Sequence, residues 1–528
     1  MRRTGNWWRN GVAIVALLTG LGAARAADEG LFAVAHAGAV LDVPGANTVM
    51  DYAPTGALRD DAKSALAPPL PPEAQPADSA QTPPSPAPAP TPPTTADRLP
   101  AALDALIARP GALNALGAGD WRKTREAVKQ FYATRQFAPA WTDSKGLNDA
   151  GRSVLARLAR AGEDGLDLKP FTLPAADRAE TDPDGLAVLE ASVASAVAVY
   201  ALEASGARIV PTSISPDVTA RAQVVDPAQA LAEVAAATDP DAALKGFNPP
   251  QEGYRRLREK LSQLAAPKAA ASFDGAQVIR AAAGADAESP RRYAILANME
   301  MWRWEPREMG RDRIEINVPD FTLHLIRNDA EVEHSRVIVG KPQTPTPIFS
   351  NAIKYLLVNP IWRVPPSIVQ KEMLPHADAN PGYFARMGYT VKTIRGQMFV
   401  EQPPGPGNAL GRILFMFPNE HAVYLHDTPA RGLFAAAKRA FSHGCIRVEQ
   451  PLHLAVEVMG GAANGWSTQK VEGLLGTSER TVSVPAPLPI HIEYFTEFVD
   501  DDGMLRERED VYGLTARVAA TLSRISQY

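Results

Sequence analysis

The residues best suited to covalent chemistry lie in one short segment, Ser442-His443-Gly444-Cys445, which holds the only cysteine of the 528-residue chain. A thiolate nucleophile needs a lowered pKa, an approachable backbone and a nearby base. Gly444 leaves room for a substrate carbonyl beside the main chain, where amide groups can donate hydrogen bonds to a developing oxyanion. Arg447 can lower the pKa of the Cys445 thiol or hold a substrate carboxylate through two hydrogen bonds.

Two histidines can serve as the base. His443 and Cys445 are separated by one residue, so in an extended segment their side chains point the same way. His426 ends the apolar segment 422–426, which predicts a strand whose end faces the loop that carries the cysteine. We expect His426 to be the base. The spacer between the two motifs contains a predicted short helix, 433–441, that returns the chain to the sheet.

Two other interpretations of the cysteine stay open. A lone cysteine is most often a small buried residue of the core. A zinc site is the third interpretation, and its candidate ligands are His421, His426, His443 and Cys445. His421 alternates poorly with His426 along a strand, which counts against zinc. The neighbouring glycine and histidines favour a nucleophile over both alternatives.

The composition limits the partners and the cofactors. A net charge of −5 without a long basic stripe argues against nucleic acid as a partner. One cysteine excludes an intramolecular disulfide and any multi-cysteine zinc or iron–sulfur site. We therefore expect no cofactor and no metal, and the chemistry must come from the side chains.

Residues 1–26 predict a secretory signal peptide. Three arginines precede the apolar segment 12–21, which is too short to cross a bilayer, and Ala24 and Ala26 offer small residues at the positions that a signal peptidase recognises. We expect export to the periplasm. The alternative is an uncleaved segment that anchors the chain to the inner membrane, which would be its only membrane contact.

Composition and periodicity divide the rest of the chain. Residues 27–97 predict a disordered region with a proline-rich linker at 67–93. Alanine-rich helical patterns predict a scaffold domain over 98–290. Residues 291–515 predict a β-rich domain. The segments 314–318, 321–326 and 332–339 predict strands, with Asn328 and Asp329 at the turn before the last of them.

Two further segments complete this division. Residues 516–528 are predicted to form the end of a C-terminal helix. The prolines and glycines of residues 365–410 predict an irregular insertion that can cover the site as a lid.

The motifs resemble the catalytic domain of L,D-transpeptidases of the YkuD type. The family pattern is a histidine, a spacer and Ser/Thr-His-Gly-Cys, and His426 with residues 442–445 matches it. Longer segments resemble the large periplasmic YcbB-like branch: TPTPIF (344–349), VNPIWRVPPSI (358–368), PPGPGNALG (403–411), FPNEHAVYLHDTP (417–429) and SHGCIRVEQP (442–451). The resemblance implies an α+β fold with an all-α scaffold and a β-rich, β-sandwich-like catalytic domain.

The resemblance also implies roles for individual residues. Cys445 is the expected nucleophile and His426 the expected general base. The expected residues of the oxyanion hole and its loop are Ser442, His443, Gly444 and Asp427, the last through a backbone carbonyl that orients the imidazole. The candidate substrate-binding residues are Asn359, Trp362, Tyr424 and Arg447; of these, Arg447 stands where much of the wider family has asparagine.

The implied reaction is a two-step acyl transfer between peptidoglycan stem peptides. The cysteine attacks the carbonyl before the terminal D-alanine of a tetrapeptide stem, D-alanine leaves, and an amine of a second stem completes a 3–3 cross-link. Carbapenems are expected to acylate the same thiol. The alternatives are a hydrolase on the same stems (L,D-carboxypeptidase, endopeptidase or amidase) and a catalytically inactive wall-binding scaffold. No clear peptidoglycan-binding module is found between Leu264 and Arg292.

Overall fold

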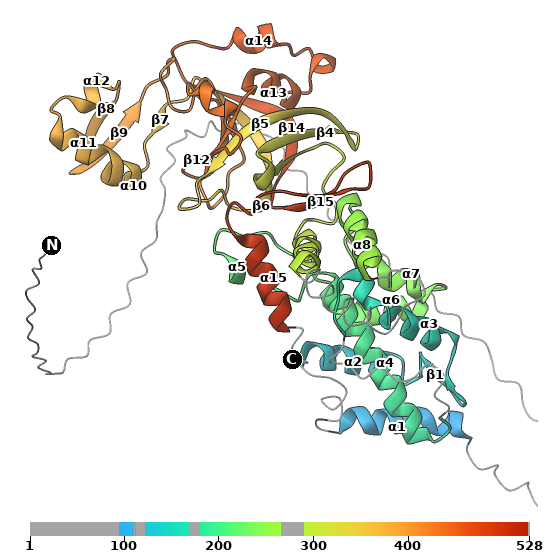
Figure 1. Cartoon of the computed structure of the whole chain (residues 1–528). Helices are drawn as coiled ribbons and strands as arrows, with labels where there is room; N and C mark the ends of the chain where they lie inside the picture. Colours follow the sequence, from blue (N-terminus) through green and yellow to red (C-terminus); the bar gives the residue numbers. More distant parts are fainter. Residues whose placement is uncertain (1–93, 110, 112–121, 169–179, 266–289, 526–528) are drawn as a thin grey trace, which may run out of the picture. The chain divides into compact units, whose positions relative to one another are not determined.

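The computed structural model describes residues 94–109, 111, 122–168, 180–265 and 290–525 (Figure 1). The predicted signal peptide, the proline-rich linker and residues 266–289 lie outside the described residues. The described part contains a helical region, a β-rich region and an insertion, and each has its own cluster of buried apolar side chains. The predicted α+β architecture, with a helical scaffold and a β-rich domain, is confirmed.

The helical region begins at Thr95, ahead of the predicted boundary at residue 98. The Thr94 hydroxyl accepts a hydrogen bond from the Asp97 amide, and the Asp97 carboxylate accepts one from the Thr94 amide, so a capping box starts the first helix. A further helix covers residues 290–302. The other elements of this region are α1 (Thr95–Ala108), α2 (Arg122–Thr134), β1 (Thr142–Asp143), β2 (Gly146–Leu147), α3 (Asp149–Leu158), η2 (Ala161–Asp164), α4 (Pro183–Ala204), α5 (Pro211–Ile214), α6 (Pro227–Ala236), α7 (Pro240–Lys245) and α8 (Glu252–Ala265).

Helix α4 is the central element of the helical region. By length and composition it is the one helix among the described residues that could cross a membrane. However, 78% of its apolar window is buried inside the protein, where α1, α2, α3 and α6 pack against it. A helix that is apolar on every side belongs either in a membrane or in a protein core. These contacts identify α4 as the core helix of the scaffold.

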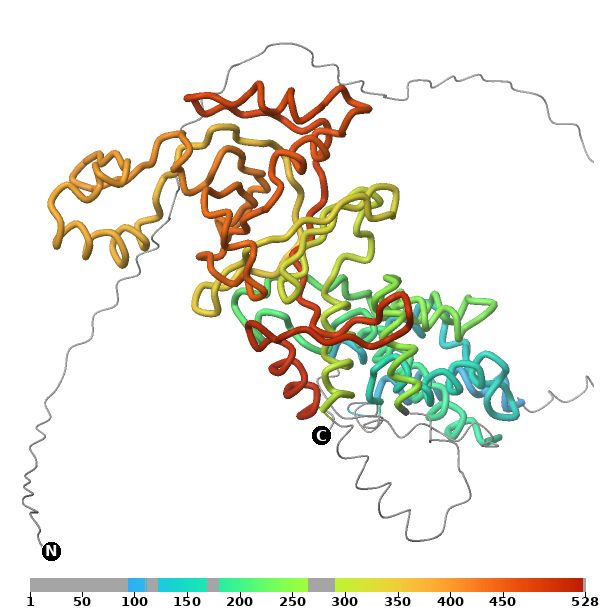
Figure 2. Tube along the Cα trace, turned by 45° about the horizontal axis from the view of Figure 1, so that its top comes forward, coloured from blue at the N-terminus to red at the C-terminus, as the bar shows by residue number. Residues whose placement is uncertain are grey.

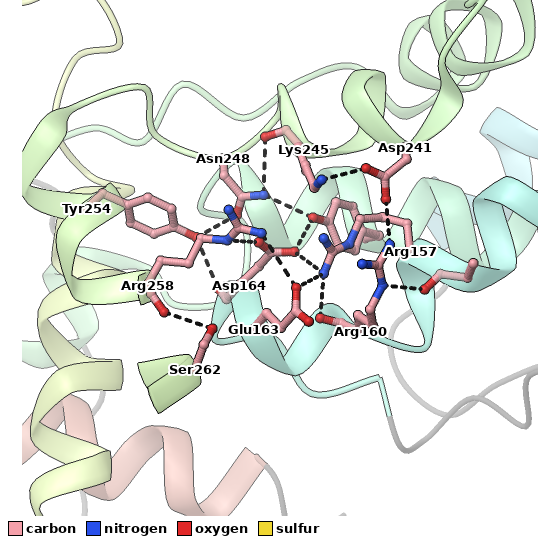
Figure 3. Close-up of polar contacts among 12 residues, drawn as sticks. Arg157, Arg160, Glu163, Asp164, Asp241, Lys245, Asn248, Tyr254, Arg258 and Ser262 are labelled. Atoms are coloured by element: carbon pink, nitrogen blue, oxygen red, sulfur yellow. Dashed lines mark hydrogen bonds and ion pairs between the residues drawn. The ribbon is translucent and has the colours of Figure 1, made fainter. Parts of the chain in front are cut away.

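A buried carboxylate, that of Asp164, links the helices of this region (Figure 3). It accepts hydrogen bonds from the Tyr200 hydroxyl and from Arg258 Nε, both at 2.6 Å. Arg157 pairs with it at 3.3 Å. The backbone carbonyl of Asp164 accepts a further bond from Arg303 Nη2 at 2.6 Å. One residue therefore ties α3, α4 and α8 to the segment that leads into the β-rich region.

The strands predicted between residues 314 and 339 are confirmed. β3 (Arg313–Asn317), β4 (Thr322–Arg327) and β5 (Ala330–Gly340) form an antiparallel meander, with Asn328 and Asp329 in the left-handed conformation at the last turn. The remaining elements outside the insertion are η3 (Val318–Asp320), β6 (Phe349–Val358), β10 (Ile413–Met416), β11 (Leu425–His426), η5 (Arg431–Ala435), β12 (Ala440–Ser442), β13 (Ile446–Val448), α13 (Pro451–Val458), η6 (Ala462–Asn464), α14 (Thr468–Glu472), β14 (Arg480–Glu493), β15 (Glu497–Val499), β16 (Leu505–Glu507) and α15 (Leu514–Ile525).

Nine strands form one mixed sheet in the order β12-β5-β13-β11-β10-β6-β14-β3-β4. The first part of β5 pairs with β4, whereas its end pairs with β13 and β12. The sheet therefore folds back on itself around a continuous apolar core. Within it, β11 and β13 run parallel, so the chain between them must cross over and return to the same edge.

Two predictions beside the candidate site are wrong in detail. The strand predicted over 422–426 is shorter than expected, since only the two residues of β11 form it. Ala422 has a positive φ of 52°, and the Asn419 side chain forms hydrogen bonds with the backbone of the turn before β11. The helix predicted over 433–441 does not form. The first residues of this segment belong to the short 3₁₀ turn η5. The last ones belong to β12, which pairs with the end of β5.

The insertion is an ordered subdomain, and the prediction of an irregular segment is wrong. Figure 2 follows the chain out of β6, through the insertion and back into β10. Val364, Val369, Met373 and Val400 form a small buried core, which accounts for its order. Its elements are β7 (Trp362–Arg363), α10 (Pro366–Ile368), the π-helical turn η4 (Val369–Met373), α11 (Leu374–Ala379), α12 (Tyr383–Arg386), β8 (Thr390–Ile394) and β9 (Gln397–Gln402), with the strands in the order β7-β9-β8.

Removing the Asp164 carboxylate is expected to destabilise the scaffold strongly. Asp164→Ala removes the buried anionic partner of Arg157 and leaves it only the partly exposed Glu163, and the loss of a buried partner costs about 3–5 kcal/mol of unfolding free energy. The matched control is Asp241→Ala, which removes partly exposed pairs with Arg160 and Lys245 and should cost below about 1 kcal/mol. Urea titration of both variants measures the difference. An equal cost for the two variants would contradict the structural role of Asp164.

Candidate active site

The pairing of β11 with β13 brings the two predicted catalytic residues close together, because His426 ends β11 and Cys445 immediately precedes β13. Leu425 lies opposite Ile446, and His426 lies opposite Arg447. The Ile446 amide donates a hydrogen bond to the Tyr424 carbonyl at 3.0 Å, which continues the pairing back toward Cys445. The segments that carry His426 and Cys445 are thus adjacent, although fifteen spacer residues, 427–441, separate the two motifs in sequence.

The His426 ring is buried and held in one tautomer. Its Nδ1 lies 2.6 Å from the backbone carbonyl oxygen of Asp427. A carbonyl only accepts hydrogen bonds, so Nδ1 carries the proton and Nε2 keeps a free lone pair. Burial lowers the pKa of His426 to about 4, the Arg447 charge adds to this, and the carbonyls of Asp427 and Leu410 oppose it. At neutral pH the imidazole is therefore uncharged and able to accept a proton.

Cys445 is partly exposed, but protein atoms surround its sulfur. This desolvation raises the pKa of the thiol to about 11, since the charged form loses most in a buried site. Hydrogen bonds from the Tyr424 amide and hydroxyl and the charge of Arg447 act in the opposite direction. At rest both groups are therefore neutral, the thiol because it keeps its proton and the imidazole because it carries only one. Such a thiol needs a base to become a nucleophile.

Tyr424 and Arg447 complete the group around the thiol. The Tyr424 ring stands edge-on to the His426 ring, with centroids 6.2 Å apart. Burial and the neighbouring Cys445 raise the pKa of Tyr424, so its hydroxyl stays protonated and can donate. Arg447 Nε is buried and has no hydrogen-bond partner in the described part of the chain. The group thus contains one proton acceptor and two groups that can donate hydrogen bonds to a substrate.

The Ser442–Cys445 loop is fixed by its own hydrogen bonds and by a facing loop. Ser442 Oγ donates to the Cys445 carbonyl at 2.5 Å and accepts from the Gly444 amide at 3.1 Å. Thr346 Oγ1 donates to the Gly444 carbonyl at 2.8 Å. Gly444 has a φ of +112°, which residues with a side chain rarely adopt. These contacts hold the main chain next to Cys445 in a conformation that requires glycine.

His443 faces the insertion. Its Nε2 lies 2.6 Å from a carboxylate oxygen of Glu372 in η4 and 3.3 Å from Lys341 Nζ. The side-chain contacts of His443 are thus to groups outside the base–thiol pair, which favours His426 as the base. Glu372 and Lys341 are absent from the prediction, because their distance from the motif along the chain leaves no local signal.

Two predicted substrate-binding residues have other partners. Asn359 donates through Nδ2 to the carbonyls of Leu474 and Ser478, both at 3.1 Å, so it fastens the end of β6 to the turn before β14. Trp362 belongs to the apolar cluster of the insertion and lies 6.1 Å from the Tyr389 ring. Among the described residues, no hydrogen bond or ring contact joins either side chain to the group around Cys445.

The zinc interpretation gains no support from the geometry. The described residues contain no group of three or more histidine, cysteine or acidic side chains that could hold a metal ion. His421, one of the candidate ligands, instead lies 2.7 Å from the Thr219 hydroxyl of the helical region.

Comparisons with known proteins assign the two regions to families. Residues 311–472 match the family profile of the YkuD L,D-transpeptidase catalytic domain, and residues 126–261 match a scaffold-domain profile. A Haemophilus influenzae protein that is provisionally named an L,D-transpeptidase is 31% identical over 224 residues, which is 39% of this chain and 45% of the relative. The chain therefore spans less than half the length of that relative.

Solved L,D-transpeptidases are also similar to part of the chain. L,D-transpeptidase 3 of Mycobacterium tuberculosis is 12% identical with a TM-score of 0.19, covering 35% of this chain and 61% of that one. The enzyme of Mycobacterium smegmatis is 12% identical with a TM-score of 0.18, covering 35% and 58%. The YcbB-like branch stays a prediction. From the family profiles and the curated relative, the chain carries an L,D-transpeptidase catalytic domain of the YkuD type together with a scaffold domain.

Proposed function

We propose that this protein is a peptidoglycan L,D-transpeptidase that forms 3–3 cross-links by cysteine acyl transfer. The observation that carries the proposal is the parallel pairing of β11 with β13, which sets the buried neutral His426 on the strand beside the Cys445 segment. An imidazole with a free Nε2, on the strand paired with the one that follows a protonated thiol, suits general-base activation. The match of residues 311–472 to the catalytic-domain family supports the same chemistry.

In the first half-reaction, the Cys445 sulfur attacks the carbonyl that joins the diamino acid of a tetrapeptide stem to its terminal D-alanine. The C–S bond forms while His426 Nε2 takes the thiol proton. When the tetrahedral intermediate collapses, the C–N bond breaks and His426 returns the proton to the amine of D-alanine. The product is a thioester on Cys445 and free D-alanine.

Two donors are available for the oxyanion of the tetrahedral intermediate. The Tyr424 hydroxyl is protonated and lies within hydrogen-bond reach of the Cys445 sulfur. The Cys445 amide donates to no backbone carbonyl in the described part of the chain. Donors that are already oriented stabilise a developing negative charge without reorganisation, which is the largest contribution in many acyl-transfer enzymes.

In the second half-reaction, an amine of another stem peptide attacks the thioester. His426 accepts the amine proton and then returns a proton to the sulfur as the C–S bond breaks. The new amide is the 3–3 cross-link, and the neutral thiol–imidazole pair is restored. Water as the acceptor would make the same site a hydrolase.

We assign Arg447 to a carboxylate of the stem peptide. Its Nε is buried without an acceptor among the described residues, and an unsatisfied buried donor is costly. A carboxylate can satisfy a guanidinium through two parallel hydrogen bonds. The positive charge beside the thiol also favours the anionic intermediate.

We also propose that the reaction takes place in the periplasm, where peptidoglycan lies. The support for this location is the signal-like pattern of residues 1–26. A carbapenem is expected to acylate Cys445, because its strained carbonyl reacts with the same nucleophile and base as the stem peptide.

Replacing Cys445 with alanine is expected to abolish both D-alanine release and the meropenem adduct, because no other thiol exists in the chain. Mass spectrometry of a disaccharide-tetrapeptide incubation and of the intact protein checks both results. Wild type should yield a cross-linked dimer. Tripeptide as the sole product would favour a hydrolase, and an absence of both turnover and adduct would favour a wall-binding scaffold.

The two histidines are distinguished by the same adduct assay. His426→Ala should slow acylation by roughly 10²–10⁴-fold, since it removes the general base. His443→Ala should have a smaller effect, because His443 contacts Glu372 and Lys341. If acylation slows more in His443→Ala than in His426→Ala, the base is misassigned.

The pH dependence of acylation follows from the two pKa shifts. His426, with a pKa of about 4, is unprotonated at neutral pH, and Cys445, with a pKa of about 11, keeps its proton. The acylation rate constant with meropenem should be nearly constant from about pH 6 to 9 and should fall as the pH drops through about 4, because His426 becomes protonated. A rate that rises in proportion to hydroxide across that plateau would indicate attack by a preformed thiolate without the base.

Replacing Arg447 with glutamine is expected to weaken stem binding by roughly 10-fold or more, since a charge-assisted pair is lost. KM for the tetrapeptide stem should rise more than kcat falls. A stem with amidated carboxylates provides the control: wild type should discriminate against it, and Arg447→Gln should discriminate much less. Equal discrimination by the two proteins would exclude Arg447 from carboxylate recognition.

A further inference from the structure

A charged contact lies directly behind the base and takes no part in the proposed reaction. The Asp427 carboxylate is 3% exposed. One of its oxygens accepts a hydrogen bond from the Thr428 amide at 2.7 Å, and the other accepts from the Arg412 amide at 2.8 Å. Arg431 Nη2 forms an ion pair with the first oxygen. Both oxygens of the Asp427 carboxylate therefore have hydrogen-bond partners, which restrict the rotation of this side chain.

Arg431 has a second partner at the end of the nucleophile strand. Its Nη1 donates to the backbone carbonyl of Glu449, the residue that follows β13. One planar guanidinium thus bridges the residue after His426 and the exit of the strand that follows Cys445. Because the donors of a guanidinium have fixed geometry, the bridge sets the distance between these two points of the backbone.

The main chain of the bridged residue holds the imidazole. The Asp427 carbonyl accepts the His426 Nδ1–H bond at 2.6 Å, and the Asp427 amide donates to the Ile413 carbonyl at 2.9 Å. Gly411 packs against the same side chain, since a Cβ there would lie 2.4 Å from Asp427 Cγ. Anchoring the carboxylate therefore limits the rotation of the carbonyl that selects the His426 tautomer.

We propose that Arg431 is a positioning residue for the acyl transfer, an inference that rests on the proposed function and extends it. Arg431 fixes Asp427, and Asp427 keeps His426 in the Nδ1–H form with Nε2 free to take the thiol proton. Without the bridge, the ring can turn or adopt the Nε2–H tautomer, in which Nε2 has no lone pair to accept the thiol proton. A supporting contact of this kind typically changes rates by about 10–100-fold.

The chain offers a matched pair of variants. Arg431→Ala removes the bridge, and because 43% of the Arg431 side chain is exposed, the variant is expected to fold. Arg336→Ala is the control: Arg336 binds the Glu449 carboxylate at 2.8 Å through Nε and is half exposed, but it has no contact with Asp427. Both changes remove one arginine that contacts Glu449, and only one of them touches the support of His426.

The kinetic experiment uses the full chain and meropenem. In Arg431→Ala the first-order acylation rate constant should fall about 10–100-fold while the half-saturating meropenem concentration stays unchanged. Arg336→Ala should behave as wild type, and millimolar guanidinium ion should restore the rate of Arg431→Ala alone. A rate constant for Arg431→Ala within about twofold of wild type, or an equal loss in Arg336→Ala, would overturn the proposal.

A second measurement is independent of activity. In ¹⁵N-histidine-labelled protein, the Nδ1–H proton resonance of His426 is identified by its loss in His426→Gln. It should be present in wild type, Cys445→Ala and Arg336→Ala, and lost or rapidly exchanging in Arg431→Ala. Retention in Arg431→Ala would overturn the proposal. If the resonance behaves as expected but no protein forms an adduct, wild type included, the proposed function fails and the positioning of His426 by Arg431 stands.

Discussion

The parallel backbone pairing of β11 with β13 is the constraint on which the site depends. The hydrogen bond from the Ile446 amide to the Tyr424 carbonyl sets the register of two very short strands. A slip by one residue would turn His426 to the other face, because side chains alternate along a strand. The loop bonds of Thr346 and the Arg431 bridge hold the same two segments from outside. The site is thus assembled by backbone geometry before any side chain acts.

Burial dominates the electrostatics of the site. It lowers the pKa of His426 and raises that of Cys445, so both groups rest uncharged. The charge of Arg447 lowers the pKa of both, which helps the thiol and hinders the imidazole. A protonated thiol is a weak nucleophile, so Cys445 stays unreactive until a base takes its proton as it attacks a bound substrate. Because the thiolate is the form of cysteine that oxidises readily, this neutral state also protects the thiol of the lone Cys445 from oxidation.

The helical region supports the catalytic region through a few specific contacts. Val218 bridges to Ile348 as an isolated β-pair, and the Thr219 hydroxyl lies 2.7 Å from the His421 ring, in the turn that leads into β11. At the other end, Asp164 joins three scaffold helices to Arg303, in the segment that leads into the first strand of the sheet. The scaffold therefore contacts the catalytic region beside the strand that carries His426.

The sequence by itself determined which residues can do chemistry, namely the cysteine motif and the distant histidine. It also determined local elements such as the hairpin at Asn328–Asp329 and the last helix, because these depend on short-range patterns. Tertiary structure alone decided the core of the insertion and the loss of the predicted helix 433–441, whose end pairs instead with β5. It also decided the contacts of His443 with Glu372 and of Arg431 with Asp427 and Glu449. These contacts join residues far apart in the chain, and neither propensity nor periodicity encodes which distant groups will meet.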